Sequence, residues 1–189
     1  RFSPNPLGEY LQTLLERDAG YQQERKSLAK RSYILEEERL MLACLKARLP
    51  MNGVFVGCAI SFYTGMGNSE ICALTWGDYR SIPEGDGKQL LVYKFLNPSG
   101  EVRRLGTEQR SAFRRVPVTA ALREMLDQRL AFVKARLAEQ EISCTGTELE
   151  KRPIVTTDTD GFSALCTAVD LRKAKEIMES AAGIEPIDG

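Results

Sequence analysis

Apolar residues recur with the period of an α-helix at the start of the chain. After the turn-forming sequence SPNP, Leu7, Leu11, Leu14 and Leu15 fall on one side of a helix, and charged residues fill the rest. Residues 1–30 are therefore predicted to form a linker or helical arm. Its apolar face is expected to dock on a core or on a partner.

Residues 31–189 are predicted to form one domain that begins with three helices. The stretch SYILEEERLMLACLKARLP starts with acidic residues and ends at a proline, as helices do. Its apolar side is predicted to consist of Leu40, Leu42, Cys44 and Leu45. The stretch NGVFVGCAISFYTG is apolar nearly all round, which is typical of a central helix, and Gly65 suits its C-terminus. Asn68 or Ser69 is then placed to cap a short helix over EICALTW.

The pattern changes after Asp86. The stretches KQLLVYKFLNP, EVRRLG and AFRRVPVT are rich in β-forming residues and are separated by turn sequences, so they are predicted to form one three-stranded antiparallel sheet. Two longer helices follow, over TAALREMLDQRLAFVKARLAEQE and ALCTAVDLRKAKEIMESAAGI. The predicted fold class is therefore α+β, a mainly helical domain with a small three-stranded antiparallel sheet.

Composition and charge narrow the choice of function without fixing a partner. The 189 residues carry 26 Lys and Arg against 26 Asp and Glu, so the overall charge does not by itself indicate nucleic acid. The chain has no histidine, and its five cysteines form no Cys-x-x-Cys pair, so neither a metal nor another cofactor is expected. These thiols are expected to be reduced and buried, as in a cytoplasmic protein. The longest apolar stretch, residues 53–62, is too short to cross a bilayer and no signal peptide precedes it, so no membrane partner is expected.

The segment SFYTGMGNSEICALTWGDY joins the apolar helix to the short one and ends in a Trp-Gly-Asp turn. In it, Thr64, Gly65, Glu70, Trp76 and Asp78 fit the frame Thr-Gly-x-Arg-x-x-Glu-[Leu/Ile]-x-x-Leu-x-Trp-x-Asp without a gap, except at the arginine. This frame resembles the first motif of the catalytic domain of tyrosine recombinases, the phage integrase family. The match is fairly specific because many positions agree at fixed spacing.

The resemblance extends over residues 31–184. The order of helix, Thr-Gly turn, helix, Trp-x-Asp, sheet and long helix is similar to the family's, and RRVPVTAALREML looks like the family's third strand and next helix. The family's separate N-terminal core-binding domain has no counterpart, and residues 1–30 look like the connection that would follow it. In this frame Glu70 and Asp78 are expected to bond backbone or neighbouring cations rather than to act as acid and base.

The resemblance implies a chemistry of which this chain carries only part. In the family a tyrosine attacks a DNA phosphodiester and forms a 3′-phosphotyrosyl intermediate. Two arginines bind the phosphate, histidines orient it, and a lysine on a β-hairpin protonates the leaving oxygen. Gly67 stands where the first arginine would be, and glycine brings neither charge nor donor. Alternatively, Gly67 is a plain turn residue that takes positive φ at little cost, and both accounts can hold together.

The resemblance places the hairpin lysine in the stretch GTEQRSAF. Glu108 or Gln109 falls near its position with Arg110 adjacent, but a guanidinium with a pKa above about 12 is a poor proton donor. Lys94, on the first predicted strand, is an alternative. The last tyrosine is Tyr93, and the chain ends close to where the family's His-x-x-Arg box would begin. The chain alone is therefore predicted to be inactive, with no catalytic residue intact.

The predicted strands and the turn between them carry a cluster of arginines. Its members are Arg103, Arg104, Arg110, Arg114 and Arg115. Strand alternation sends Arg103 and Arg104 to opposite faces, and likewise Arg114 and Arg115, so only part of the cluster can face one DNA backbone. The alternative is a solvated hairpin face, where most charge runs lie. The family resemblance favours phosphate contact by at least one of them.

The sequence thus predicts a part of a DNA integrase or site-specific recombinase from a phage or mobile element. Its expected contribution is scaffold and DNA-facing surface, and its expected partners are double-stranded DNA and other recombinase protomers. One alternative is a catalytically dead paralogue that binds DNA or a recombinase and regulates it. Another is a helical protein–protein module without affinity for DNA, which the neutral net charge keeps open.

Overall fold

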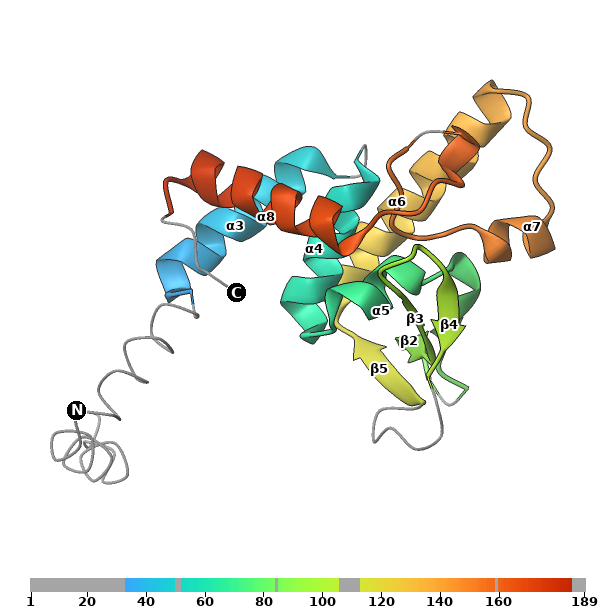
Figure 1. Ribbon diagram of the computed structural model, residues 1–189, viewed down its shortest axis with the longest axis horizontal. Helices are drawn as coiled ribbons and strands as arrows, with labels where there is room; N and C mark the ends of the chain where they lie inside the picture. The colour runs from blue at the N-terminus through green and yellow to red at the C-terminus, as the bar shows by residue number, and fades with distance from the viewer. Residues whose placement is uncertain (1–32, 50–51, 84, 106–112, 159, 185–189) are drawn as a thin grey trace, which may run out of the picture.

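The fold is α+β, as predicted, with helices predominating and two small antiparallel sheets (Figure 1). The computed structural model describes residues 33–49, 52–83, 85–105, 113–158 and 160–184. The predicted arm at residues 1–30 lies outside these ranges.

The elements follow one another in an order that separates helices from strands. The helices are α3 (Leu35–Arg48), α4 (Gly53–Thr64), α5 (Asn68–Ala73), α6 (Ala120–Glu139), α7 (Gly146–Lys151) and α8 (Ala168–Ala182), with 3-10 turns η1 (Trp76–Asp78) and η2 (Asp160–Phe162). The strands are β1 (Tyr79–Ser81), β2 (Lys88–Val92), β3 (Lys94–Leu96), β4 (Val102–Arg104) and β5 (Arg114–Val118). In Figure 1, α3 and α8 lie side by side at one end, and the strands gather with α5 toward the other. Within the described residues, no helix is both long enough and apolar enough to span a membrane.

Helix α4 is the centre of the fold, as its apolar sequence predicts. It packs against α3, α5, α6 and α8, and most of its side chains are buried. The side chain of Asn52 accepts a hydrogen bond from the amide of Val54 and caps the first turn. Gly65 ends the helix with φ of 64°, the left-handed conformation that glycine adopts without steric cost.

Helix α3 is confirmed, but its apolar face is rotated from the predicted one. Met41 and Leu45, one turn apart, are its buried residues, while Leu42 and Cys44 are half-buried against the core. Leu40 is 48% exposed, so its assignment to the buried side was wrong. The reason is geometric: Leu40 lies about 100° around the helix from Met41, which takes the core position.

The strands form two sheets rather than the single predicted one. The three-stranded sheet has the order β1-β2-β5, with β2 in the middle, and β3 pairs with β4 in a separate hairpin. The first predicted strand is interrupted at Tyr93, whose carbonyl accepts a hydrogen bond from Leu105, beyond β4. On the far side of this break Lys94 turns to Asp78 rather than extending the β2 ladder. The sequence also missed β1, which has only three residues and directly follows η1.

A charged residue of α6 lies inside the core, where the helical period calls for an apolar one. Arg129 of α6 is fully buried and forms an ion pair with Asp158, in the loop before η2. Its guanidinium also lies over the rings of Phe132 and Phe162, at 5.5 and 5.4 Å. Asp158 in turn accepts a hydrogen bond from the amide of Gly53, the first residue of α4, at 3.0 Å. The pair therefore ties α6, the loop and α4 together.

Removing the carboxylate of Asp158 is expected to destabilise the fold strongly. The variant Asp158→Ala removes the carboxylate that pairs with the buried guanidinium of Arg129, and breaking a buried ion pair typically costs about 3 kcal/mol or more. Urea unfolding followed by circular dichroism measures the change. As a matched control, Glu139→Ala removes the partner of Arg136, a half-exposed pair on the same helix, and should cost less than about 1 kcal/mol. Equal losses in the two variants would contradict a structural role for the buried pair.

Candidate functional site

The candidate site is built on the segment from Thr64 to Asp78, between the central helix and the sheets. The hydroxyl of Thr64 donates to the carbonyl of Ile60 at 2.5 Å and accepts a hydrogen bond from the amide of Met66 at 3.3 Å. Thr64 thus closes α4 while the chain reverses at Gly65. Met66 is buried in the core, which fixes the turn against the helices.

The backbone at Gly67 does not require glycine. Its φ of −67° and ψ of 143° are available to any residue, and a Cβ there would meet only the carboxylate of Glu70, at 3.6 Å. The residue that needs positive φ in this turn is Gly65. A purely conformational reason for Gly67 is therefore excluded, and an exposed position that accepts a side chain remains.

Gly67 is also the N-cap of α5, where the sequence predicted Asn68 or Ser69. The amide of Gly67 donates to the carboxylate of Glu70 at 3.2 Å, and the carbonyl of Gly67 accepts from Glu70 and Ile71. Because the Glu70 side chain closes this end of the helix, a side-chain cap at residue 68 or 69 is not needed. The helix then ends at Ala73 rather than running to Trp76.

Glu70 is held by Arg114 of β5. The two terminal guanidinium nitrogens of Arg114 each donate to one oxygen of Glu70 at 2.6 Å, a two-point pairing that fixes the orientation of both side chains. The side chain of Glu70 is 14% exposed and that of Arg114 is 35% exposed. These hydrogen bonds from Arg114, helped by the Gly67 amide, lower the pKa of Glu70 below its ordinary value, against the opposing effect of burial. Arg114 therefore anchors α5 to the three-stranded sheet.

Asp78 makes the equivalent connection to the other sheet. Its carboxylate accepts hydrogen bonds from the amide and the hydroxyl of Thr75, each at 2.8 Å, and pairs with Lys94 of β3 at 2.7 Å. The side chain of Asp78 is 3% exposed and that of Lys94 is 13% exposed, so this ion pair is largely shielded from solvent. Both carboxylates of the motif bond backbone and neighbouring cations, as predicted. Trp76 is buried beside them, with its ring edge-on to that of Tyr79.

The arginine cluster is divided by the structure. Arg103 and Arg104 on β4 and Arg115 on β5 are exposed, whereas Arg114 is occupied by Glu70 and faces the core side of its sheet. The registers pair Arg104 with Lys94 and Arg103 with Phe95, which confirms the opposite faces predicted for the two arginines. Arg110, Glu108 and Gln109 lie outside the described residues.

Lys94 is the functional candidate that the sequence analysis undervalued. The stretch LLVYKFL contains one charge in seven otherwise apolar or aromatic positions, which signals a buried cation with a fixed partner. The Lys94 ammonium also donates to the hydroxyl of Thr75 at 3.1 Å. It is thus directed into the motif, at the junction of the two sheets.

Three buried thiols and one buried phenol among the described residues are not activated as nucleophiles. Burial raises the pKa of the thiols of Cys58, Cys72 and Cys166 to about 12, so they stay protonated at neutral pH. Burial, with a hydrogen bond to Asp127, also raises the pKa of the Tyr79 phenol. In the same part of the chain no group of three or more cysteine and carboxylate side chains is placed to hold a metal ion. Phosphate binding by exposed arginines is the chemistry that this surface can support.

The chain matches no protein-family model, no curated protein and no solved structure.

Serine substitutions at the two glycines of the turn test the different demands at these positions. Gly67→Ser should leave the free energy of unfolding unchanged or raise it by about 0.5 kcal/mol, because serine is a favourable N-cap. Gly65→Ser should lower it by about 1 kcal/mol, because the left-handed conformation is costly for a residue with a Cβ. Chemical denaturation of both variants measures the difference. Equal effects of the two substitutions on the free energy of unfolding would show that position 67 requires the backbone conformation of glycine.

The Glu70–Arg114 pair should make stability depend on acid. Since the folded pKa of Glu70 is lowered, its contribution is complete above the unfolded pKa of about 4.3 and is lost as pH falls through the folded value. Glu70→Gln should therefore flatten the loss of stability below about pH 5. Arg114→Met should do the same, because it returns Glu70 toward its ordinary pKa. Urea unfolding from pH 7 to 3 measures the slope, and an unchanged slope in both variants would refute the coupling.

Proposed function

We propose that this chain is part of a DNA integrase or site-specific recombinase of the tyrosine recombinase type. The observation that carries the proposal is the Thr64–Asp78 motif: a Thr-Gly turn, a short helix and a Trp-x-Asp turn fill the family frame without a gap, except at the arginine. The order of α4, α5, η1, the antiparallel strands and α6 agrees with the order that the resemblance implies. On this proposal the whole domain has the tyrosine recombinase catalytic fold.

The role proposed for residues 33–184 is to hold DNA rather than to cut it. The exposed guanidinium group of Arg115, and that of one of the opposite-facing residues Arg103 and Arg104, suit contact with backbone phosphates, which need cations but no base-specific geometry. Lys94 is the proposed counterpart of the family's hairpin lysine, because it lies between β2 and β4 and points into the motif. The family's histidines and nucleophilic tyrosine have no counterpart in this sequence, which contains no histidine.

Gly67 restricts the proposed role to DNA binding, because it stands where the family's first phosphate-binding arginine would be. An arginine there would stand beside Glu70 and within reach of the same surface as Arg114, and the backbone would accept it. Glycine removes one charged donor of the kind whose loss costs roughly 10²–10³ in rate. This observation favours the second candidate, a catalytically dead paralogue that binds DNA or a recombinase and regulates it. The mass of the natural gene product separates the two, because a regulator of this size has a mass near 21.1 kDa and an integrase a much larger one.

DNA binding by this chain is expected to depend steeply on salt. Each phosphate contact adds about 0.9 to the slope of log K against log salt, so contact through several arginines predicts a slope of a few units. Fluorescence anisotropy with a labelled duplex at 25 to 200 mM salt measures it. Arg103→Ala and Arg115→Ala should each lower the slope by about 0.9.

The control for this experiment is Arg136→Ala, which removes a half-exposed arginine at the far end of α6 and should leave the slope unchanged. Gly67→Arg should raise the slope by about 0.9, whereas Gly67→Gln, similar in size but uncharged, should not. Identical binding by these two variants would show that residue 67 does not face phosphate. No binding at low salt would refute the DNA proposal and leave a helical protein–protein module.

A further inference from the structure

The three-stranded sheet has an exposed outer face on the side away from the helices. On β5, Arg114 points to the helical side, where it pairs with Glu70 of α5. The residues that alternate with Arg114, namely Phe113, Arg115 and Pro117, are all exposed. Figure 1 shows β5 below α4 and α5, toward the edge of the molecule. On β5, the outer face thus carries an aromatic ring, a cation and a proline.

Strands β1 and β2 contribute the rest of the outer face. Pro117 lies opposite Gln89 of β2, and Gln89 lies opposite Arg80 of β1, so these three residues form one row across the sheet. Arg115 lies opposite Leu91 in the next row of the same face. These positions carry two guanidinium groups and no carboxylate. The outer face is therefore suited to an anionic partner.

Phe113 and Arg115 form one unit at the edge of this face. Phe113 is 58% exposed, and the guanidinium of Arg115 lies over its ring, 6.0 Å from the centroid. Among the described residues Arg115 forms no ion pair with a carboxylate, so nothing in that part of the chain neutralises its charge. Arg80 is the weaker cation of the two, because it donates to the carbonyl of Gly77 and lies 3.5 Å from Glu150.

We infer that the outer face binds single-stranded DNA, with an unpaired base stacked on Phe113 and a backbone phosphate on Arg115. Exposed aromatic rings beside cations hold single strands in many proteins, because every base has a flat π-face and every nucleotide a phosphate. In a duplex each base is already stacked on its neighbours, so the ring can take only an unpaired base. The choice of DNA as the nucleic acid rests on the proposed function, whereas the stacking rests on the geometry of Phe113.

The small apolar area of the outer face argues against a protein partner. Its exposed apolar side chains are Phe113 and Pro117, and Leu91 is half-buried. A specific protein–protein interface takes about 800 Å² and about 20 residues from each partner, which is more than one face of three short strands supplies. A single strand requires only a ring and a cation for a nucleotide to bind.

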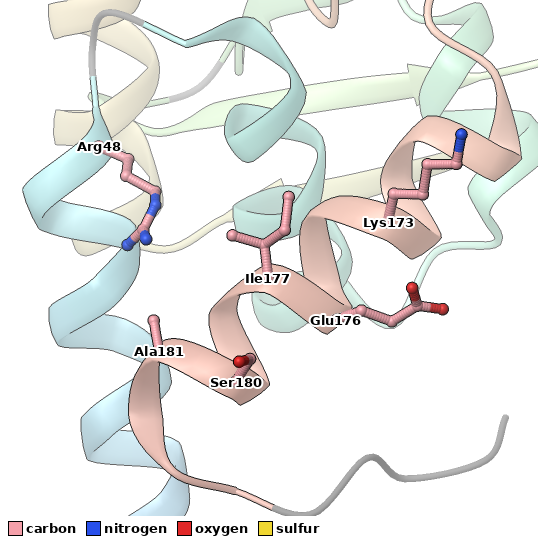
Figure 2. A pocket seen from close by; sticks show the side chains of 6 residues that line it. All are labelled: Arg48, Lys173, Glu176, Ile177, Ser180 and Ala181. Carbon is pink, nitrogen blue, oxygen red and sulfur yellow. The ribbon is translucent and has the colours of Figure 1, made fainter.

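The groove between α3 and α8 is another open surface, but its charges do not select an anion. Its volume is about 500 Å³, and its lining consists of Arg48, Lys173, Glu176, Ile177, Ser180 and Ala181. Figure 2 shows Lys173 and Glu176, which have opposite charges, projecting from α8 across from Arg48 of α3. None of these lining residues is aromatic. Charge and ring content therefore favour the outer face of the sheet as the site for a strand.

Fluorescence anisotropy with a labelled thymidine strand of about 12 nucleotides tests the stacking. Phe113→Leu keeps an exposed apolar side chain but removes the ring, and it should weaken binding roughly tenfold, as loss of one stacked base does. Phe113→Tyr keeps the ring and should bind like the unaltered chain. The control is Val169→Ala, which shortens an exposed apolar side chain on α8, outside the outer face, and should change nothing.

Two further probes separate the ring from the charge. An abasic strand of the same length has phosphates but no base to stack, so it should bind the unaltered chain and Phe113→Leu equally. Arg115→Ala should lower the slope of log K against log salt by about 0.7 for both strands, the value for one phosphate of a single strand. Binding of a duplex should be the same in Phe113→Leu and Phe113→Tyr, because paired bases do not reach the ring.

Three results would overturn the inference. The first is equal binding of the thymidine strand by Phe113→Leu and Phe113→Tyr, with circular dichroism showing both folded. The second is no binding of this strand at low salt by a chain that binds the duplex, which would leave the proposed function intact. The third is tighter, ring-dependent binding of a uridine strand, which would assign the face to RNA. Ring-dependent binding of the thymidine strand without affinity for the duplex would support the inference and refute duplex binding.

Discussion

The buried guanidinium of Arg129 connects three parts of the chain that are distant in sequence, and the position of the central helix depends on it. Arg129 holds Asp158, and Asp158 accepts the first amide of α4. The contact is so close that a Cβ on Gly53 would lie 2.6 Å from the Arg129 side chain and 2.7 Å from that of Asp158. Helix α4 packs on α3, α5, α6 and α8. The position of its first residue therefore determines the position of the Thr64–Asp78 motif, which follows its last turn.

At that other end, two carboxylates attach the motif to two different sheets. Glu70 holds β5 through Arg114, and Asp78 holds β3 through Lys94. The motif is therefore the joint between the helical part and both sheets, and the exposed arginines on β4 and β5 take their positions from it. A short sequence pattern with two carboxylate anchors thus organises a surface that lies some 25 to 50 residues further along the chain.

The sequence predicts the helices well because their signals are local. Caps, glycine and periodicity place α3, α4, α6 and α8, although the rotation of α3 and the ends of α5 and α8 differ. The short helix α7 was not predicted. The sheets are less predictable, because the break at Tyr93 results from a tertiary contact between Lys94 and Asp78 that no local pattern encodes. The same limit applies to the site. Spacing identifies Glu70 and Asp78, but their partners Arg114 and Lys94 become visible only when the strands are in place. A buried arginine among apolar positions, such as Arg129, has no sequence signal apart from its place in the stripe.

The apolar surface of α4 has a consequence for how the domain unfolds. Helices from both the first and the last part of the chain cover α4, with α3 on one side and α6 and α8 on others. Loss of any one of them would expose a helix that has no charged residue in its sequence GVFVGCAISFYT. Neither half of the domain can therefore persist as a folded intermediate with α4 in water, and the helical part should unfold as one cooperative unit. A break anywhere between α4 and α8 would release both fragments together rather than leave a stable remnant.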